Sequence, residues 1–344
     1  MKKNTDSAIS HAPKRRGSLF QWEYSLFIAI LAIIAILFIK APTGVNARVL
    51  LDITFLFIEK GILTIPLALI IIMGDIDISV GSTLAMVSVV FGVLMKNSVN
   101  VWIALPVLIL VGIAAGFFNG FMIVKTKVPS IAITLGTFTL YRGIAYILLE
   151  NQTINVFPEK LAFIGQGYIF NIVPIPLLIF VILAVVFGLI LHRSTFGRGI
   201  YLIGNNRLAS LYSGVKINNT RIILFTLMGF VAAIGAIILT FRQMNTRPNI
   251  AMGFEFECII MAVMGGVSIM GGKGKMIGVV LGIYFVGLSR NVLYILNVPS
   301  ETMRIIIGAM LIFAILIPEI MANRKKRLLT LQGYEQKATR GQER

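Results

Sequence analysis

Apolar residues run along most of this chain in long stretches separated by short polar segments. Ten stretches are close in length to a bilayer-spanning helix of about 20 residues, and they predict spans at 24–40, 53–73, 78–95, 101–124, 130–149, 172–191, 222–241, 257–272, 276–296 and 303–321. A soluble chain of this size has no way to bury so many helices that are apolar on every side. The pattern therefore predicts an all-α integral membrane protein with about ten transmembrane helices.

One transmembrane domain is expected to occupy most of the chain. Residues 1–23 are predicted to form an N-terminal tail, 24–321 the transmembrane domain and 322–344 a basic C-terminal tail. No A-x-A-like cleavage site follows the first apolar stretch, so we expect this stretch to remain as a span. No segment is long enough for a separate soluble domain. The machinery that drives the protein is therefore expected on other chains, unless an ion gradient drives it.

Composition supports the membrane interpretation. Hydrophobic residues make up 57% of the 344 residues and charged residues 13%, whereas soluble proteins carry about a quarter charged residues. The net charge of +17 would suit a nucleic-acid partner, but the Lys and Arg residues lie in tails and short loops beside apolar stretches. Because no nucleic-acid-binding motif accompanies them, we expect no nucleic-acid partner and a membrane lipid environment instead.

The basic residues also predict an orientation. Ten spans place both tails on one side of the membrane, and the segments expected there hold 21 of the 31 basic residues, whereas the opposite set holds seven. Basic residues favour cytoplasmic loops. We therefore expect both tails and the loop 192–221 in the cytoplasm, and the connections 150–171 and 242–256 outside it.

Few residues offer metal or catalytic chemistry. Cys258 is the single cysteine, and His11 and His192 are far apart in the sequence, so no Cys/His cluster for a metal is expected. Residues 271–275, Gly-Gly-Lys-Gly-Lys, invite comparison with a phosphate loop, but neither register has Gly, four residues and then Gly-Lys-Ser/Thr. We therefore expect no metal, no cofactor and no ATP hydrolysis in this chain.

The most distinctive segment is residues 74–82, Gly-Asp-Ile-Asp-Ile-Ser-Val-Gly-Ser, which lies between two apolar stretches. Ionisable groups at membrane depth are costly and usually functional. Gly74 and Gly81 permit unusual backbone conformations and close helix approach. Besides two continuous helices, a broken or re-entrant stretch is a possible structure here.

This segment resembles a motif of the ribose-type branch of ABC importer permeases. Further segments resemble other motifs of that family in the expected order, and they are residues 115–120, 128–143, 196–215 and 265–274. Ser210 stands where the family often has Ala. The resemblance implies a multi-pass permease of the bacterial inner membrane.

The resemblance also implies partners. Two ATP-binding subunits would hold ATP and Mg and drive the permease, which would pair with a second copy or a paralogue. An extracytoplasmic sugar-binding protein would deliver a pentose, hexose or related furanose. Ribose, rhamnose, galactose and autoinducer-2 are all carried by relatives, and the choice among them stays open.

An amphipathic helix is predicted in the loop 192–221. Leu208, Leu211, Tyr212 and Val215 recur at i, i+3, i+4 and i+7, with Asn205 or Asn206 to cap the start and Gly214 to end it. Such a helix either docks into a groove of an ATPase, as the resemblance favours, or lies flat in the membrane interface. The predicted coupling residues are Arg198, Gly204, Asn205, Asn206, Leu208, Leu211, Tyr212 and Gly214.

A second set of polar residues falls within the predicted spans. Ser130, Thr134, Thr137 and Tyr141 form one stripe that either lines the solute path or bonds across a helix interface, and the interface is the simpler interpretation. Residues for translocation or helix packing are accordingly Asp75, Asp77, Ser79, Ser130, Thr134, Thr137 and Tyr141.

Asp75 and Asp77 have two interpretations. They either cap the N-terminus of the third span or carry a coupling ion, as in secondary transporters. Arg142 and Arg290 either pair with these acids or extend to a membrane surface. The main hypothesis is an importer permease powered by partner ATPases, and the alternatives are an ion-coupled carrier using Asp75 and Asp77 or a membrane enzyme. The enzyme is disfavoured because no nucleophile–base pair is visible.

Overall fold

The computed structural model describes residues 18–40, 47–299, 301–303, 305–310, 312–313 and 316. The predicted C-terminal tail at 322–344, most of the N-terminal tail at 1–23 and part of the predicted span 303–321 lie outside these residues. Of the predicted N-terminal tail, residues 18–23 belong to the first helix.

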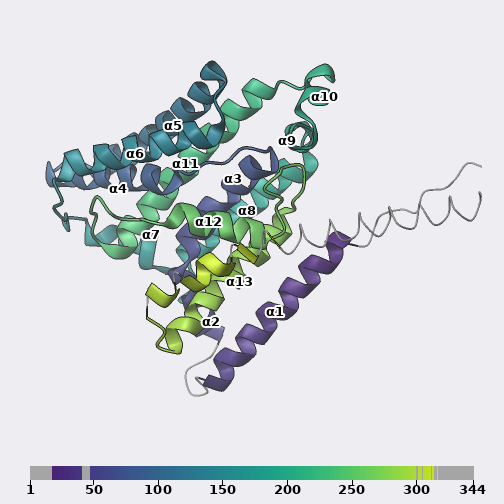
Figure 1. Ribbon diagram of the computed structural model, residues 1–344. Coiled ribbons are helices and arrows are strands. Elements are labelled where there is room, and N and C mark those ends of the chain that lie inside the picture. Colours follow the sequence, from purple (N-terminus) through teal and green to yellow (C-terminus); the bar gives the residue numbers. More distant parts are fainter. Residues whose placement is uncertain are drawn as a thin grey trace, which may run out of the picture.

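The described chain is mostly helical (Figure 1). In chain order its elements are α1 (Ser18–Lys40), α2 (Ala47–Asp52), η1 (Ile53–Leu56), α3 (Ile58–Ile72), α4 (Val80–Lys96), α5 (Val101–Thr126), α6 (Ser130–Leu149), η2 (Glu159–Leu161), α7 (Phe163–Gln166), β1 (Tyr168–Ile169), β2 (Val173–Pro174), α8 (Ile175–Arg193), α9 (Thr195–Asn205), α10 (Arg207–Tyr212), α11 (Ile217–Gln243), α12 (Phe254–Met264) and α13 (Met276–Ile295). The two short strands pair antiparallel, with Tyr168 opposite Pro174 and Ile169 opposite Val173.

Six helices of the described chain are long and apolar enough to cross a bilayer, namely α1, α5, α6, α8, α11 and α13. A seventh candidate is the pair formed by residues 48–56 and α3, which is bent by 65°. Helix α4 is apolar but has 17 residues. The protein is therefore a helical membrane protein with six or seven candidate spans in its described part, rather than ten continuous ones.

The expected span at 257–272 is wrong as a continuous helix. Helix α12 has 11 residues and ends at Met264, and residues 265–275 follow as a non-helical loop. Gly266, Gly271 and Gly272 have φ values of 84°, 82° and 71°, which a right-handed helix does not use. At about 1.5 Å per residue, α12 reaches about 16 Å, or half of a bilayer core.

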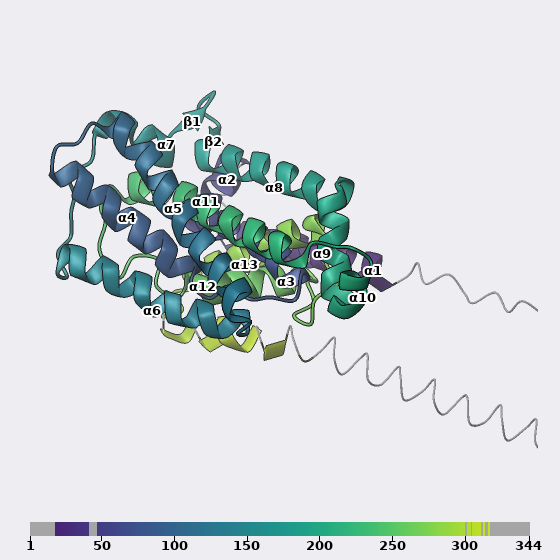
Figure 2. The ribbon, with the colours of Figure 1, turned by 90° about the horizontal axis from the view of Figure 1, so that it is seen from above.

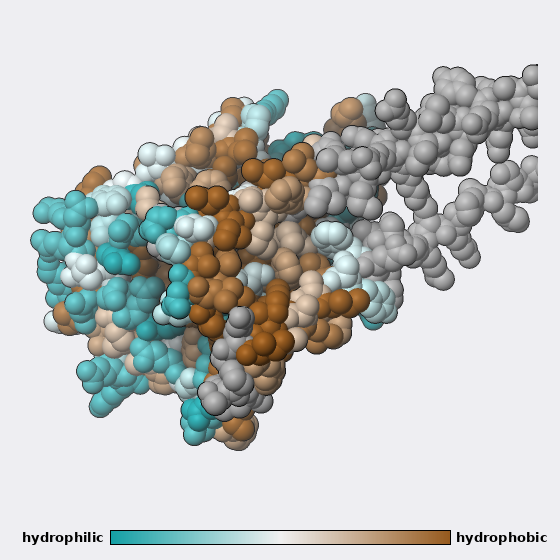
Figure 3. All heavy atoms as spheres, turned by 60° about the horizontal axis from the view of Figure 1, so that its bottom comes forward, coloured by the Kyte–Doolittle hydropathy of each residue, from teal (hydrophilic) through white to brown (hydrophobic). Residues whose placement is uncertain are grey.

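Helix α3 forms the centre of the structure. All of its residues are buried, and it packs against α8, α11, α12 and α13 (Figure 1). A helix that is apolar on every side is stable only when other elements enclose it. The outer helices, by contrast, leave apolar side chains exposed, among them Val181, Ile182 and Val185 of α8, and apolar side chains cover much of the face in Figure 3.

Helices α5 and α11 approach each other through glycine. Gly112, Gly116 and Gly120 of α5 lie at i, i+4 and i+8 and face α11, where Gly229 meets both Gly112 and Gly116. Small residues at such spacing let two membrane helices come into backbone contact, which maximises van der Waals packing where lipid offers no hydrophobic driving force. The long α11 is thereby fixed against α5.

The loops lie at two opposite ends of the helices (Figure 2). At the α10 end, Tyr201 Oη donates to Gly274 O at 2.6 Å, and the loop between α5 and α6 lies beside α10. At the α7 end, Ile154 pairs with Thr246 in a β-bridge. The described loops that hold most of the basic residues therefore lie at the same end of the helices. This is expected if successive predicted spans cross the membrane in opposite directions.

Substituting Gly116 with Ala tests the helix contact. A methyl group at this position would overlap the carbonyl oxygen of Phe225, so we expect the detergent-solubilised protein to lose about 2 kcal/mol of stability through overpacking. Gly136→Ala is the matched control, because no atom lies within 4 Å of a methyl group there. Thermal unfolding should show a lower midpoint for Gly116→Ala alone, and equal midpoints would contradict this contact.

Candidate coupling and translocation site

Residues 74–79 join α3 to α4 without helical structure. Gly74 has φ of 89°, and this backbone conformation turns the chain out of α3. Glycine adopts it at little steric cost because it has no Cβ atom. Asp75, Asp77 and Ser79 in this segment are nearly fully buried. Non-helical backbone and buried charge at membrane depth persist only where the protein supplies polar partners.

Arg221 supplies the partner of Asp75. Its Nε donates to Asp75 Oδ2 at 2.7 Å and its Nη2 to Asp75 Oδ1 at 2.6 Å. This is a two-pronged, charge-assisted contact, the strongest geometry for such a pair. Both side chains are buried. The pair fixes the segment 74–79 to the first turns of α11, directly after the loop that carries α10.

A chain of hydrogen bonds extends from Asp77 into two neighbouring helices. Asp77 Oδ1 accepts from the Ser79 backbone N–H at 2.8 Å and from Ser79 Oγ at 2.7 Å. Asn119 Nδ2 of α5 donates to Ser79 Oγ at 2.8 Å, and Tyr141 Oη of α6 donates to Asn119 Oδ1 at 3.0 Å. Every member of this network is buried, so it joins the segment 74–79 to both α5 and α6.

The polar stripe of α6 packs against the same segment. Ser130 Oγ accepts from the Ile76 N–H at 3.2 Å, and Thr134 Oγ1 donates to Ile76 O at 3.3 Å. Thr137 is buried and its hydroxyl donates to Thr134 O. Ser130 and Thr134 therefore bond to the segment 74–79 in this structure, whereas the Thr137 hydroxyl bonds within α6.

Neither of the two arginines proposed from the sequence as partners of Asp75 and Asp77 binds these acids in the structure. Arg142 Nη1 donates to the carbonyl oxygens of Pro248 and Ile250, and Arg290 pairs with Glu257, so neither contacts Asp75 or Asp77. Asp75 does not cap α4, whose N-cap is Ser79. Asp77 binds the N–H of that residue and thus holds the start of the helix.

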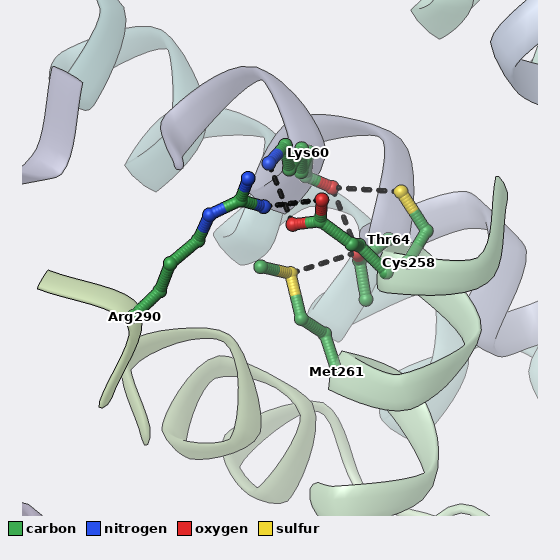
Figure 4. A network of polar contacts seen from close by, with 6 residues as sticks. Lys60, Thr64, Cys258, Met261 and Arg290 are labelled. Carbon is green, nitrogen blue, oxygen red and sulfur yellow. Dashed lines mark hydrogen bonds and ion pairs between the residues drawn. The ribbon is translucent and has the colours of Figure 1, made fainter. Parts of the chain in front are cut away.

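A buried ion cluster lies between α3, α12 and α13 (Figure 4). Glu257 pairs with Lys60 at 2.5 Å and also with Arg290. Thr64 Oγ1 and Cys258 Sγ both donate to the Lys60 carbonyl oxygen, at 2.7 Å and 3.4 Å. Each charged group has a partner of opposite sign, which is the condition for tolerating charge within a membrane protein. Its location at a three-helix contact indicates a structural role.

Three glycine-bearing segments meet at the α10 end, namely the chain after α3, the last turn of α9 and the loop after α12. Gly272 N–H donates to Ile72 O at 2.8 Å, and a methyl group at Gly204 would overlap that same carbonyl oxygen and the Gly272 nitrogen. A methyl group at Gly271 would lie 3.0 Å from the Cα of Gly74. The segments around residues 74, 204 and 271, which are far apart in the sequence, thus form one tight backbone junction.

Helix α10 (Arg207–Tyr212) begins where the sequence predicts and ends shortly before Gly214, so Val215 of the predicted stripe lies beyond the helix. The Asn206 side chain accepts a hydrogen bond from Ala209 N at 3.0 Å, which confirms Asn206 rather than Asn205 as the cap. Gly214 follows the helix with φ of 77°. Asn205 is the last residue of α9 and lies against Gly272.

The apolar residues of α10 are uncovered. Leu208, Leu211 and Tyr212 are 69%, 58% and 87% exposed. Arg198 is exposed on α9 and lines a small cavity with Val215 and Lys216. This face of α10 therefore has no covering element among the described residues.

A cavity of about 1000 Å³ opens between α10 and the segment 74–79. Its lining includes the Asp75–Arg221 pair and the two apolar residues Leu208 and Leu211, together with Lys127, Ser130, Arg207 and Lys216. Partial desolvation, followed by repulsion from the Arg221 cation, lowers the pKa of Arg207 from its usual value. The lining is thus basic and joins the predicted coupling residues to the predicted translocation residues.

Residues 49–315 match the family model described as branched-chain amino acid transport system / permease component. The chain belongs to this permease family. The permease is a multi-pass membrane subunit of a transport system, and the match covers every element described above from α3 to α13.

Characterised relatives cover almost the whole permease. The autoinducer 2 import system permease protein LsrD of Photorhabdus temperata is 32% identical over 90% of this chain and 94% of its own. The same protein of Enterobacter sp. (strain 638) is 32% identical over 88% and 94%. The ribose import permease protein RbsC of Haemophilus influenzae is 30% identical over 89% and 96%. The resemblance to ribose-type importer permeases is confirmed. No solved structure matches the chain.

Sequence reasoning missed two residues that organise the permease. Arg221 was assigned only to the basic loop, and Asn119 only to a family motif, although they hold Asp75 and Ser79. A signal for the first was present, because residues 192–221 hold five bases and no acid. A base of that loop that becomes buried, as Arg221 does, needs an acid from elsewhere in the chain.

Removing either charge of the Asp75–Arg221 pair should cost more than removing both. Arg221→Leu leaves a buried carboxylate without its partner, which costs about 3–5 kcal/mol. The double variant Asp75→Asn, Arg221→Leu leaves no unpaired charge and should unfold at a higher temperature than Arg221→Leu. Thermal unfolding of the solubilised permease checks this, with Arg198→Leu, an exposed cation on α9, as the control near wild type. A double variant as unstable as Arg221→Leu would contradict the pairing.

Proposed function

We propose that the permease moves a monosaccharide or a related furanose across the bacterial cytoplasmic membrane, driven by two separate ATP-binding subunits. A second permease copy or a paralogue completes the membrane part, and an extracytoplasmic binding protein delivers the solute. The relatives are named as import permeases for autoinducer 2 and ribose, and these names support this class of solute. ATP and Mg belong to the partner subunits.

One observation carries this proposal. Helix α10 presents exposed Leu208 and Leu211 beside the cavity that also contains the Asp75–Arg221 pair. An amphipathic helix whose apolar face is uncovered is a ligand for a hydrophobic groove. We assign that groove to the ATP-binding subunit, so that movement of α10 reaches the segment 74–79 through Arg221 on α11. The docking set comprises Arg198, Gly204, Asn205, Asn206, Leu208, Leu211, Tyr212 and Gly214.

The proposed topology has ten membrane segments with both tails in the cytoplasm. In it, α3, α4 and α12 are shorter membrane segments and residues 303–321 complete the set. The basic residues carry the orientation, since 21 of 31 fall on the proposed cytoplasmic side. The α10 end then faces the cytoplasm and the α7 end faces outward.

Thiol labelling of intact cells tests the topology. Lys160 and Lys273 are both exposed, at the proposed outer and inner ends, and each is replaced by Cys in a Cys258→Ala background. A membrane-impermeant maleimide should label Lys160→Cys in intact cells, and Lys273→Cys only after the membrane is opened. The opposite result would reverse the orientation, and labelling of both in intact cells would reject the ten-segment topology.

The Leu211→Asp variant tests energy coupling. A carboxylate in a desolvated apolar contact loses hydration without gaining a partner, so we expect ATP-driven uptake by the reconstituted importer to fall at least about tenfold. Membrane levels should stay near normal, because Leu211 lies on an exposed helix outside the candidate spans. Ser213→Asp places the same charge two residues away, off the apolar stripe, and should retain uptake.

The energy source is tested in the same proteoliposomes. Uptake by the wild-type importer should require ATP inside and should not respond to an imposed proton or sodium gradient. Asp77→Asn should reduce it modestly, since Asn retains an acceptor oxygen for the Ser79 N–H. Gradient-driven uptake without ATP that disappears in Asp77→Asn would instead establish an ion-coupled carrier.

A further inference from the structure

A second non-helical stretch lies next to the segment 74–82. Residues 244–253 connect α11 to α12 without regular structure, and Ala251 and Gly253 have φ of 56° and 87°. Arg142 of α6 holds this stretch through its Nη1, at 2.7 Å from Pro248 O and 2.8 Å from Ile250 O. Helix α12 starts directly afterwards at Phe254. The permease thus contains two neighbouring non-helical stretches, residues 74–79 and residues 244–253, rather than one.

These two non-helical stretches meet near the middle of the proposed membrane. Arg142 stands twelve residues after Ser130 in α6, about 18 Å along the helix. Glu255 stands nine residues before Met264 in α12, about 14 Å along that helix. Both helix ends lie at the α10 end, and a bilayer core is about 30 Å thick. In the proposed topology Arg142 and Glu255 therefore lie at mid-membrane depth, so the end of the connection 242–256 enters the membrane rather than lying wholly outside it.

Glu255 also lies against the start of α4. A methyl group at Gly81 would overlap Glu255 Oε2, so only glycine lets the carboxylate approach the backbone this closely. Arg142 and Glu255 are near enough to interact electrostatically. No direct ion pair joins these two residues in the described chain. The charges thus share one region between α4, α6 and α12 without closing on each other.

Several buried polar atoms here have no hydrogen-bond partner in the described structure. They are Arg142 Nε and Nη2, Glu255 Oε2 and, at the residue that follows Gly81, Ser82 Oγ. Arg142, Glu255 and Ser82 are 8%, 2% and 0% exposed. Leaving such groups unpaired is costly, and ionisable groups at membrane depth usually serve a function. The nearby Glu257 differs, because Lys60 and Arg290 both bind it. An external ligand would supply hydrogen-bond partners for the atoms of Arg142, Glu255 and Ser82, whereas Glu257 already has its partners.

We propose that Arg142, Glu255 and Ser82 form a mid-membrane station that binds the hydroxyl groups of a neutral polyol during transport. The inference rests on the proposed importer function and names the solute chemistry at one point of its path. A guanidinium donates to hydroxyl oxygens, a carboxylate accepts from hydroxyl hydrogens, and a serine hydroxyl does both. One positive and one negative charge cancel, so the station favours a neutral solute over an anion or a cation.

The location of the station also links it to the coupling residues. Ser82 follows the Asp77–Ser79 network by three residues, at the start of α4. Asp75, at the other end of the same segment, is held by Arg221. A displacement of α11 at Arg221 would therefore move the start of α4 relative to Glu255 and separate the two from their close contact.

Accessibility during turnover tests the station without knowledge of the solute. Ser82→Cys is made in a Cys258→Ala background and assembled with the ATP-binding subunits, the binding protein and the second permease chain. The probe is 2-hydroxyethyl methanethiosulfonate, a small neutral reagent that carries a hydroxyl group. We expect labelling during ATP hydrolysis to be at least tenfold faster than for Thr64→Cys, a fully buried position on α3. Glu255→Cys provides an independent second position.

Uptake measurements supply the second arm. Glu255→Gln should lower ATP-driven uptake of D-ribose at limiting concentration by about tenfold or more, since a hydrogen bond to a charged group is lost. Glu257→Gln, the matched control two residues away, should lower the unfolding temperature but keep uptake per folded importer within about twofold.

Labelling of Ser82→Cys and Glu255→Cys no faster than Thr64→Cys would overturn the station. So would equal uptake by Glu255→Gln and wild type. Either result, with ATP-driven uptake intact in the wild type, leaves the importer function standing. An importer that takes up no solute with ATP would reject the proposed function itself.

Discussion

The membrane interior offers no water to satisfy a polar group, and this constraint governs the centre of the permease. The segment 74–79 is non-helical, so its backbone amides and carboxylates must find partners within the protein. Arg221 binds Asp75 with two hydrogen bonds, and Ser79, Asn119 and Tyr141 extend the contacts of Asp77. Without these partners the break between α3 and α4 would be too costly to persist.

The same contacts determine what can move together. The α10 helix precedes Arg221 by a short loop, and Arg221 holds Asp75, so a force on α10 has a short covalent and ionic path to the segment 74–79. Glycines make the surrounding contacts stiff. Gly204 brings the last turn of α9 into direct backbone contact with Ile72 and Gly272, and Gly116 does the same for α5 and α11. Close-packed backbone moves as a unit rather than absorbing a displacement locally.

Two buried charge clusters on α12 differ in their degree of satisfaction. Glu257 has two cationic partners and joins three helices, which is the arrangement expected of a group that stabilises the fold. Within the described structure, Glu255, two residues earlier, has one oxygen without a hydrogen-bond partner, and it interacts electrostatically with Arg142, whose Nε and Nη2 lack partners there too. Since the cost of burying a polar group depends on its partners, satisfaction rather than burial separates a structural charge from one available to a ligand.

The sequence alone determined the membrane class, the permease family and a short amphipathic helix after Asn205 or Asn206, because hydropathy and capping depend on neighbouring residues, whereas the structure assigns the cap to Asn206. It also marked Asp75 and Asp77 as unusual, since a charge within an apolar stretch is visible without a structure. Only the tertiary structure decided that α12 ends at Met264, that Arg221 rather than Arg142 or Arg290 binds Asp75, and that Glu255 lies against Gly81. Those outcomes depend on which helices pack together, and a pair such as Asp75 and Arg221, 146 positions apart, leaves no periodic signal along the chain.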